Sequence, residues 1–503
     1  MTARAPAASA PARRRAPAAS ALLLALACAV LAGCAGRGPV KEPPPRVDLP
    51  AAWSEGAPAH PEWPDRNWWQ GFGSPELAHL VDEGQAGNLE LAGALARVRQ
   101  AEAGARIAGV ALLPTASFYG GASRTVPLRS GSAGTSADSG VQVSYEVDFW
   151  GKNKAGAASA QAALAANRFD RQTVALTVTS GIVSTYLQVL SLHDRLAVAR
   201  ENVANAEHVL ALVEAQKSVG AASSLDLARQ RSAVAQQKAD IPDLQQQERE
   251  AQAALAILLG KAPQTFSIGR KGLDTITLPE VSPGLPSELL ARRPDIRRAE
   301  ASLAAANADV AVARANLFPS IQLTGSMGTQ SSALLSLLNA PNLLANVSAS
   351  LVAPIFDGGR LKRERDLAIA RKEELVEAYR ATVIAALSEV DTALGQIRSL
   401  DEQRRLKATE LEQARRAYDL SEIRYKAGAE DFMTVLDTQR ALSDVQNDVG
   451  ILKLKRLQAT VALFKALGGG WQDGQDVSAA GAPAHVRAPP ARPAPPGTPA
   501  AAG

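Results

Sequence analysis

The side chains of this chain that could act in acid–base, nucleophilic or metal chemistry are few and scattered. It has five histidines, two cysteines and three methionines in 503 residues. The chain contains no HExxH motif, GxSxG elbow or phosphate-binding loop, and no Met or His cluster that would suggest a metal relay. We therefore expect neither an enzyme nor a cofactor-binding protein. The histidines are His60, His79, His193, His208 and His485, and we expect His193 and His208 to lie on helix surfaces.

Cys34 is the residue whose context predicts a covalent modification. Arg13, Arg14 and Arg15 precede an apolar run from Ala21 to Ala32, the order of a secretory signal with a small-residue cleavage site. The segment Leu-Ala-Gly-Cys that ends at Cys34 resembles the bacterial lipobox, in which the Cys is lipidated. Each buried acyl carbon contributes about 0.8 kcal/mol to membrane binding. We predict a signal peptide over 1–33 and a lipid anchor at Cys34; a secretory peptide with an incidental Cys is the alternative.

The charge balance and the remaining cysteine narrow the class further. The chain carries 54 basic and 50 acidic residues, and the expected signal peptide holds four of the basic ones and no acid. The mature chain is therefore balanced, which gives no electrostatic case for nucleic-acid binding. Cys28 lies in the signal, so no disulfide framework is expected. Ala35, rather than Asp, follows the anchor and favours the outer membrane over the inner membrane.

Two halves of the chain share one plan when the sequence is shifted against itself by about 205–208 residues. The shift aligns Pro114 with Pro319, Gly151 with Gly359, and Gly220 with Gly428. Each half reads as helix, strand, loop, strand, long helix, Gly turn and helix. We expect a first repeat over 76–259 with a leading helix at 76–110, a second repeat over 288–467 with a leading helix at 288–315, and strand–helix transitions at Gly151 and Gly359.

Strand periodicity follows each leading helix. Val141, Val143, Tyr145 and Val147 alternate with polar residues, which is the period of two that gives a strand one apolar and one polar face. No charge occurs between Ala315 and Phe356, and alternating segments of about ten residues are typical of a transmembrane β-barrel. A half-buried strand of a soluble sheet is the alternative. The predicted strands lie near 115–125, 141–149, 320–329 and 346–355.

Long helices follow the strands. From Lys152 to Val219 apolar residues recur at 3-4 spacing without a slip, which predicts a coiled-coil seam. A matching segment runs from Leu361 to Ala427, and a shorter helix returns after each Gly turn. The last helix breaks its seam at Arg456. Flanking these parts we expect a Pro- and Trp-rich arm over 34–75, a connector with short β-like pieces over 260–287, and a disordered Ala/Pro-rich tail over 468–503.

Four strands cannot close a conducting barrel, and open edges are not tolerated in lipid, so several copies must share one. At this point the chain resembles the TolC-like, and more narrowly the NodT-type, outer-membrane factors of tripartite efflux pumps. The resemblance covers about 60–471. It is carried by Pro-Ser-Glu-Leu-Leu-Ala-Arg-Arg-Pro-Asp-Ile (286–296), Ala-Arg-Ala-Asn-Leu-Phe-Pro-Ser-Ile (313–321), Pro-Ile-Phe-Asp-Gly-Gly-Arg (354–360) and Tyr-Lys-Ala-Gly-Ala-Glu-Asp-Phe-Met-Thr-Val-Leu-Asp-Thr-Gln-Arg (425–440).

The resemblance implies a mainly α fold with a small β part. It implies a homotrimer in which each copy gives four strands to a twelve-stranded barrel in outer-membrane lipid and its long antiparallel helices to a periplasmic α-barrel. It also implies that a periplasmic adaptor docks at the hairpin turns near Gly220 and Gly428, above an inner-membrane pump. The chain would then be an exit duct that carries small molecules out of the periplasm, with the pump supplying the energy.

The resemblance further places a gate after the second hairpin turn. A family Asp that narrows the periplasmic entrance corresponds to Asp437, with an apolar residue one turn before it at Met433 and an Arg three residues after it at Arg440. Three carboxylates converging on an axis would attract cations and could pair with neighbouring Arg. The alternative is an ordinary solvated helix face.

Two other classes remain open at this stage. A periplasmic coiled-coil lipoprotein, acting as scaffold or adaptor, would also have heptads and a lipobox but would lack the paired strands. A passive porin would need many more strands per chain and no such helices. Neither the transported substrate nor the particular pump follows from the sequence.

Overall fold

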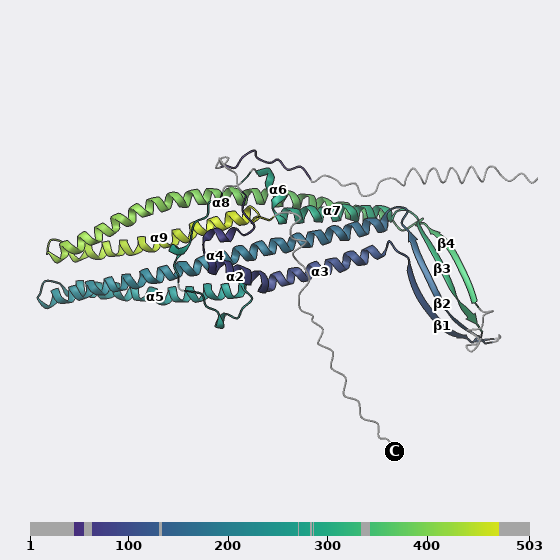
Figure 1. The fold of residues 1–503 in the computed structure, drawn as a ribbon, viewed down its shortest axis with the longest axis horizontal. Coiled ribbons are helices and arrows are strands. Elements are labelled where there is room, and N and C mark those ends of the chain that lie inside the picture. Colours follow the sequence, from purple (N-terminus) through teal and green to yellow (C-terminus); the bar gives the residue numbers. More distant parts are fainter. Residues whose placement is uncertain are drawn as a thin grey trace, which may run out of the picture.

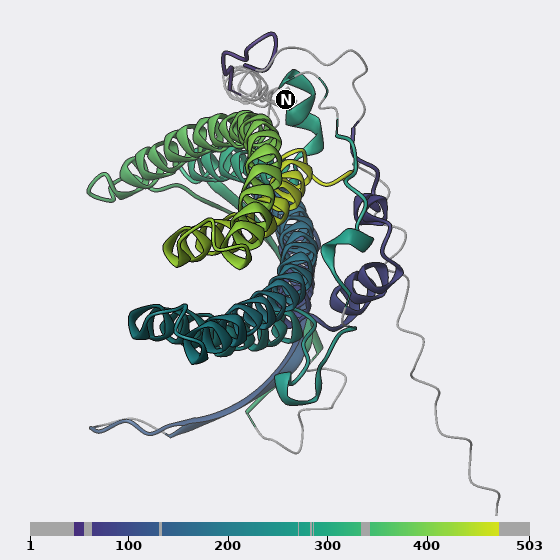
Figure 2. The ribbon, with the colours of Figure 1, turned by 90° about the vertical axis from the view of Figure 1, so that its left-hand side faces the viewer.

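The computed structural model describes residues 45–54, 63–129, 133–269, 271–281, 284, 286–332 and 343–471. Over these residues the molecule is a long rod with a four-stranded sheet at one end and two helical hairpins at the other (Figure 1). Viewed from the hairpin end, the hairpin of α8 and α9 lies over that of α4 and α5 (Figure 2). Cys34 and residues 472–503 lie outside the described residues, and so do residues 35–44 and 55–62 of the predicted N-terminal arm.

The first helical part of the rod is a short 3-10 helix, η1 (Trp68–Phe72), followed by α2 (Pro75–Gly87) and α3 (Leu89–Val110). A single helix over 76–110 is therefore wrong. The chain breaks at Asn88, whose backbone is extended and whose side chain accepts a hydrogen bond from Leu91 N at 2.9 Å. An Asn at this position caps the new helix and satisfies one of its free N–H groups. The break lets α2 and α3 pack on α4 in different directions.

The sheet is fully antiparallel, in the order β1 (Thr115–Thr125), β2 (Gly134–Val147), β3 (Ser320–Ser331) and β4 (Leu343–Val352). All four predicted strands are present. The second begins seven residues earlier than expected, because its Gly- and Ser-rich start pairs with β1 and β3 although it lacks apolar alternation. β1 and β4 are edges with one partner each.

The two repeats have helices of equal length. α4 (Lys152–Ser218) and α8 (Arg360–Lys426) both have 67 residues, and the returning α5 (Ser224–Leu258) and α9 (Phe432–Ala466) both have 35. α3 and α7 (Pro294–Ala315) both have 22. These bounds agree within two residues with the ends predicted for the long helices. Part of α4 is apolar enough to cross a membrane by composition, and much of this stretch is the buried centre of the rod.

Equivalent hydrogen bonds join the ends of the helices in both repeats. The Asn88 side-chain amide donates to Leu258 O at 2.8 Å, and Arg293 Nη1 donates to Ala466 O at 2.9 Å. In each case the residue before the 22-residue helix binds a carbonyl at the end of the 35-residue helix. Next to these contacts, Gly260 and Gly468 adopt left-handed conformations against the backbone of Gly87 and Arg292.

The connector between the repeats differs from expectation. Among its described residues there is no strand; it contains the 3-10 turns η2 (Pro263–Thr265), η3 (Leu273–Thr275) and η4 (Pro286–Glu288), followed by the short α6 (Leu289–Arg292). Its apolar residues pack individually onto the helices instead of pairing with a neighbour. At the other end, residues 468–471 form a turn whose Trp471 ring lies against Phe169, so the predicted tail begins later than 468.

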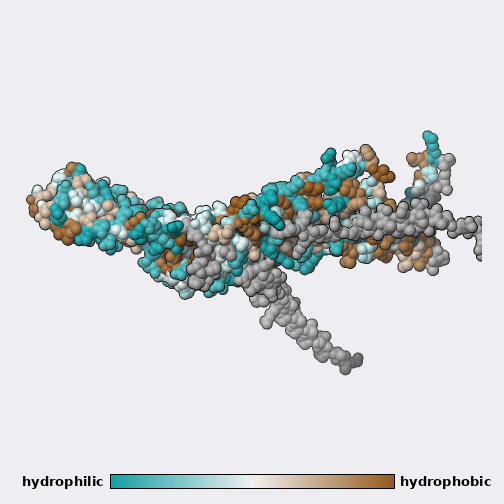
Figure 3. Space-filling model, turned by 90° about the horizontal axis from the view of Figure 1, so that it is seen from above, coloured by the Kyte–Doolittle hydropathy of each residue, from teal (hydrophilic) through white to brown (hydrophobic). Residues whose placement is uncertain are grey.

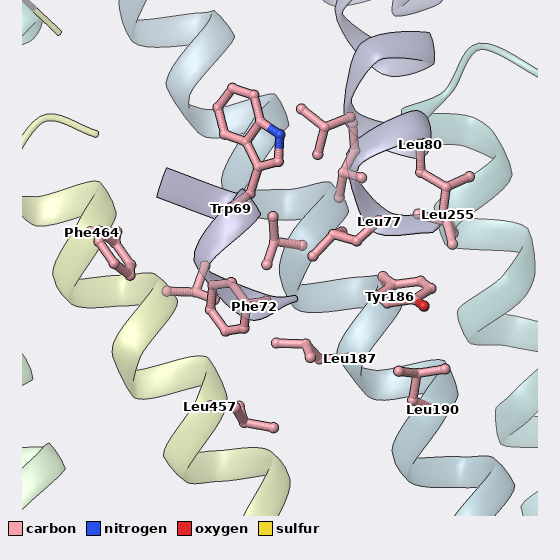
Figure 4. Close-up of a cluster of buried hydrophobic side chains, with 14 of the residues drawn as sticks. Trp69, Phe72, Leu77, Leu80, Tyr186, Leu187, Leu190, Leu255, Leu457 and Phe464 are labelled. Atoms are coloured by element: carbon pink, nitrogen blue, oxygen red, sulfur yellow. The ribbon is translucent and has the colours of Figure 1, made fainter. Parts of the chain in front are cut away.

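The largest cluster of buried side chains lies at mid-rod (Figure 4), where α2, α4, α5 and α9 converge on the N-terminal arm. Trp68 stacks on Phe464 at a centroid distance of 4.7 Å, and Leu457 completes the cluster. The Arg456 break in the last helix seam is thus filled by Leu457, while Arg456 itself turns to Asp401 of α8. A second cluster holds Trp53 of the arm against α6, α8 and α9.

Candidate functional site: the sheet, the junction and the hairpin tips

The sheet has two chemically different faces, and its register carries each face across all four strands. One row is Phe118, Val141, Met327 and Ala345; the row beside it is Ser117, Gln142, Ser326 and Asn346. Hydroxyls on the polar face bond across strands, as Thr324 Oγ1 and Ser348 Oγ do at 2.6 Å. Among the described residues nothing covers the apolar face, on which Phe118 and Met327 are 77% and 59% exposed, so these side chains are suited to contact lipid.

The polar face carries one aromatic residue among its described positions, Tyr119. It lies in register with Gly140 and Gly328, whose Cα atoms approach so closely that a Cβ on either would meet the other backbone. The Tyr119 hydroxyl lies over this pair. The glycines therefore leave the space that the tyrosine fills, and this pairing helps to set the strand register.

The junction of sheet and helices is built around two left-handed glycines. Gly151 (φ 76°) and Gly359 (φ 85°) immediately precede α4 and α8, where a side chain would be strained. Asp148 accepts from the backbone N–H groups of Asn153 and Lys154 at 2.9 and 2.8 Å. Asp357 accepts from Leu361 N and Gly359 N, and these bonds lower the pKa of its carboxyl.

Sequence reasoning identified the two junction glycines but missed these carboxylates. The signal that would have identified them is the short spacing from an Asp to the glycine and the helix start, since a carboxylate there satisfies the free N–H groups of the first turn. An aromatic pair braces the same region: Trp150 stacks on Phe318 at 4.6 Å and donates its indole N–H to Pro319 O at 2.7 Å.

The turns at Gly220 and Gly428 close the two hairpins in the same way. Their φ angles are 78° and 74°. Beyond each glycine a backbone N–H bonds back to a carbonyl of the long helix, Ala221 N to Gln216 O at 2.8 Å and Ala429 N to Arg424 O at 2.9 Å. Ser223 and Asp431 then cap the returning helices. Both tips are therefore tight, preformed and exposed to solvent.

The three residues predicted for the gate lie on the first three turns of α9. Asp437 and Arg440 are exposed and Met433 is partly buried against the tip cluster. Within the part of the chain that the structure describes, the side chains of Asp437 and Arg440 form neither a hydrogen bond nor an ion pair, with each other or with any other group. A pair with Arg440 inside one chain, which the sequence left possible, is thus absent from the single copy.

Contacts between the two hairpins surround this segment and were not anticipated. His208 of α4 reaches Glu422 of α8 at 3.7 Å, and Lys426 pairs with the same carboxylate at 2.7 Å. Burial and the nearby carboxylates of Glu422 and Asp419 raise the pKa of Tyr418 to about 12. Burial, with Asp226 of α5 as the second cause, raises the pKa of Tyr425. Both phenols are neutral at physiological pH.

Of the two histidines expected on helix surfaces, His208 is largely exposed and His193 is not. The described residues contain no group of three or more His, Cys, Asp or Glu side chains arranged to hold a metal ion. The carboxylates described above act as helix caps and ion-pair partners.

The family model for the outer membrane efflux protein matches residues 80–261 and 285–469. Because this is more than half of the chain, the protein belongs to the outer membrane efflux protein family. It is an outer-membrane channel component of an efflux system, an exit duct of a tripartite pump. The family consists of channel proteins.

The relatives and solved structures agree over nearly the whole chain. The pyoverdine export outer membrane protein OpmQ of Pseudomonas aeruginosa is 45% identical over 467 residues, covering 90% of this chain and 97% of the relative. The cation efflux protein CusC of Escherichia coli is 30% identical, covering 80% and 88%. The outer-membrane channel OprN has a TM-score of 0.80 at 28% identity, covering 86% of this chain and 99% of OprN. The open-state MtrE channel of Neisseria gonorrhoeae also has a TM-score of 0.80, at 26% identity.

Proposed function

We propose that three copies of this chain form one duct, in which twelve strands make a closed barrel through the outer membrane and the long helices continue it into the periplasm. The observation that carries this proposal is a two-faced sheet with two open edges. Within the described part of the chain, β1 and β4 each leave one row of backbone N–H and C=O groups without a strand partner. Such edges are not stable in hydrocarbon, and pairing β4 of one copy with β1 of the next removes all of them.

The flanks of the chain support this ring arrangement. Beside β1, Ile107 and Leu113 are 72% and 61% exposed; beside β4, Ile355 and Phe356 are 99% and 92% exposed. On the face shown in Figure 3, apolar residues gather in patches on the part of the rod nearest the sheet and also at the hairpin end, with hydrophilic stretches between them. The two flanks differ from each other, so the β1 flank of one copy suits a head-to-tail contact with the β4 flank of the next, and such contacts close a ring.

The internal repeat supports six-fold pseudosymmetry of such a duct. Equal helix lengths and the matching contacts of Asn88 and Arg293 fit two copies of one structural unit in each chain. Three chains would then contribute six similar hairpins. We further propose that the tips at Gly220 and Gly428 face a periplasmic adaptor joined to an inner-membrane pump, and that Asp437, Met433 and Arg440 line the entrance.

The assembly has a direct test. Protein extracted in mild detergent should have the mass of a trimer and should form channels in planar bilayers. A stable monomer that leaves the bilayer unchanged would contradict the proposal and favour a scaffold lipoprotein. Channels formed by monomers would contradict only the proposal that three copies share one barrel.

We also propose a cargo to test first. The two relatives named for pyoverdine export are 45% and 44% identical to this chain, and the relatives named for cation efflux are about 30% identical. In a strain that lacks its own pyoverdine export channel, this chain should restore secretion if the cargo is shared. Restored tolerance to toxic metal cations without restored secretion would instead favour the cation-efflux relatives.

A further inference from the structure

His193 lies on α4 with a side chain only 9% exposed. Both of its ring nitrogens face acceptors. Nε2 lies 3.0 Å from Glu248 Oε1 of α5, and Nδ1 lies 3.1 Å from the carbonyl oxygen of Lys271 in the connector. This one imidazole therefore joins three segments: the long helix, the returning helix and the chain that links the two repeats.

The geometry has a consequence for protonation. Neutral imidazole has only one N–H. If Glu248 is ionised, the other ring nitrogen would direct its lone pair at an oxygen acceptor, which is unfavourable. The contacts are satisfied when the pair holds one additional proton, whether it resides on the ring or on the carboxylate. The carboxylate atom that faces His193 also accepts from Gln252 Nε2 at 3.0 Å, so this oxygen acts as an acceptor toward both neighbours.

The second repeat holds a permanent pair at the equivalent positions. The shift that superimposes α4 on α8 and α5 on α9 carries His193 to Asp401 and Glu248 to Arg456. Arg456 Nε donates to Asp401 Oδ1 at 2.7 Å. At this height each hairpin thus has a basic and an acidic side chain in contact between its two helices, with the basic partner on the long helix in one hairpin and on the returning helix in the other. Guanidinium is always charged, whereas imidazole gains its second proton only in the mildly acidic range.

We propose that His193 is a proton-dependent clamp, which holds α4, α5 and the connector together in acid and releases them as the pH rises, while the second hairpin remains clamped at all physiological pH values. The clamp itself follows from contacts within one chain. Only its exposure to periplasmic acidity rests on the proposed function. In the duct, three such clamps would form a ring at mid-rod that responds to pH on one hairpin of each copy.

The other charged groups around the clamp are already engaged. They lie on α4, α5, the connector, α2 and α9, and each has a partner other than His193. On α4, Asp194 accepts from Leu273 N and Arg195 donates to Asn447. On the other elements, Asp243 accepts from Gln247, Asp274 pairs with Lys453, and Glu76 accepts from Gly269 N. Asp194, Arg195 and Asp243 also line a cavity of about 290 Å³ between α4, α5 and α9.

The test is hydrogen–deuterium exchange of the full-length trimer in detergent at about pH 6 and pH 8, with rates corrected for the intrinsic pH dependence of exchange. Peptides from the connector around 271–276 and from α5 around 245–255 should exchange about tenfold faster at the higher pH, the effect of one charge-assisted hydrogen bond. Peptides around Asp401 and Arg456 should show no such difference.

Variants separate the clamp from general loosening. His193→Gln should exchange fast at both pH values, and His193→Arg, which keeps a permanent cation, should exchange slowly at both. The matched variant Arg456→His moves the device to the other hairpin, so its α8 and α9 peptides should become pH-dependent. Equal protection of the wild-type connector at both pH values would overturn the proposal. So would an Arg456→His protein whose second hairpin stays insensitive to pH.

Discussion

At the scale of single residues, the role of a side chain can depend on whether one copy or the assembled trimer is considered. Asp437 is exposed and unpaired in the described chain, which by itself fits a solvated helix face. His193 is complete within one chain, because both nitrogens already have partners. A structure of one copy therefore explains the clamp directly, whereas the gate depends on three copies of Asp437 coming together near an axis.

Asp437→Ala tests the gate. If three carboxylates line the entrance, their removal weakens attraction for cations and changes the closed state. We expect higher single-channel conductance and weaker cation preference in planar bilayers, with trimer stability nearly unchanged. The difference should be largest at low ionic strength, since salt screens exposed charges over about 10 Å at 0.1 M. Glu214→Ala, near the tip of α4, is the control for general loss of negative charge, and equal effects in both variants would return Asp437 to a surface role.

Asp240 gives a pH prediction. Burial, together with Asp243 and Asp444, raises the pKa of its carboxyl, so the folded chain binds this proton more readily than the unfolded chain does. The group therefore destabilises the fold at neutral pH, and this penalty disappears as the pH falls through the raised folded pKa. Asp240→Asn should raise the thermal midpoint slightly at pH 7 and have less effect near pH 4. A larger gain in acid than at neutrality would contradict this sign.

At the scale of elements, local patterns predicted the long parts well. Seams of 3-4 spacing and left-handed glycines are local signals, so the ends of α4 and α8 and both hairpin turns were predicted to within two residues. The break at Asn88 combines a local cap on Leu91 N with a tertiary bond to Leu258 O, and the tertiary bond is the part that a local pattern does not predict. The short β-like pieces expected in the connector are not strands in the structure. Its apolar residues, such as Ile276, pack singly on the helical core, and the described residues provide them no strand partner.

Among the contacts that join one element to another, we expect those of the Arg293 side chain to contribute most to the free energy of unfolding. Its side chain is 8% exposed and binds Asp295, Glu389 and Ala466 O together. Arg293→Met leaves these acceptors without a cation. Because the Asp295 and Glu389 side chains are 23% and 56% exposed, water screens part of the loss, and we expect a cost of about 2–4 kcal/mol. Its counterpart Asn88→Ala removes neutral bonds only and should cost about 1–2 kcal/mol. Denaturant unfolding of the trimer should rank the two variants in this order, and the reverse order would mean that the second repeat does not depend on this junction.

At the scale of the whole molecule, the N-terminal arm would connect the predicted lipid anchor at Cys34 to the rod. Trp53 Nε1 donates to Gly284 O at 2.7 Å, and Ser54 binds Asp391 twice. These contacts hold the arm whether or not Cys34 carries lipid. We therefore expect Cys34→Ser to abolish acylation and signal processing, seen as a change in mass, while the helical content of the rod is kept. An unmodified Cys34 in the mature wild-type protein would contradict the anchor.

The shared barrel makes a prediction that a free sheet edge does not. Consecutive N–H groups of an antiparallel strand point alternately to the two neighbouring strands. In β1, one of Ser117 and Phe118 therefore donates toward β2 and the other points away from it. Proline removes the N–H and is tolerated in sheets mainly at open edges. If β1 stayed an edge, one of the variants Ser117→Pro and Phe118→Pro would be mild and the other severe. If β4 of the next copy pairs with β1, both N–H groups are needed in lipid, where an unsatisfied group costs several kcal/mol. We expect both variants to lose most of the detergent-extracted trimer and its conductance. A near-normal yield of trimer from either one would leave β1 an open edge and remove the main argument for a barrel closed between copies.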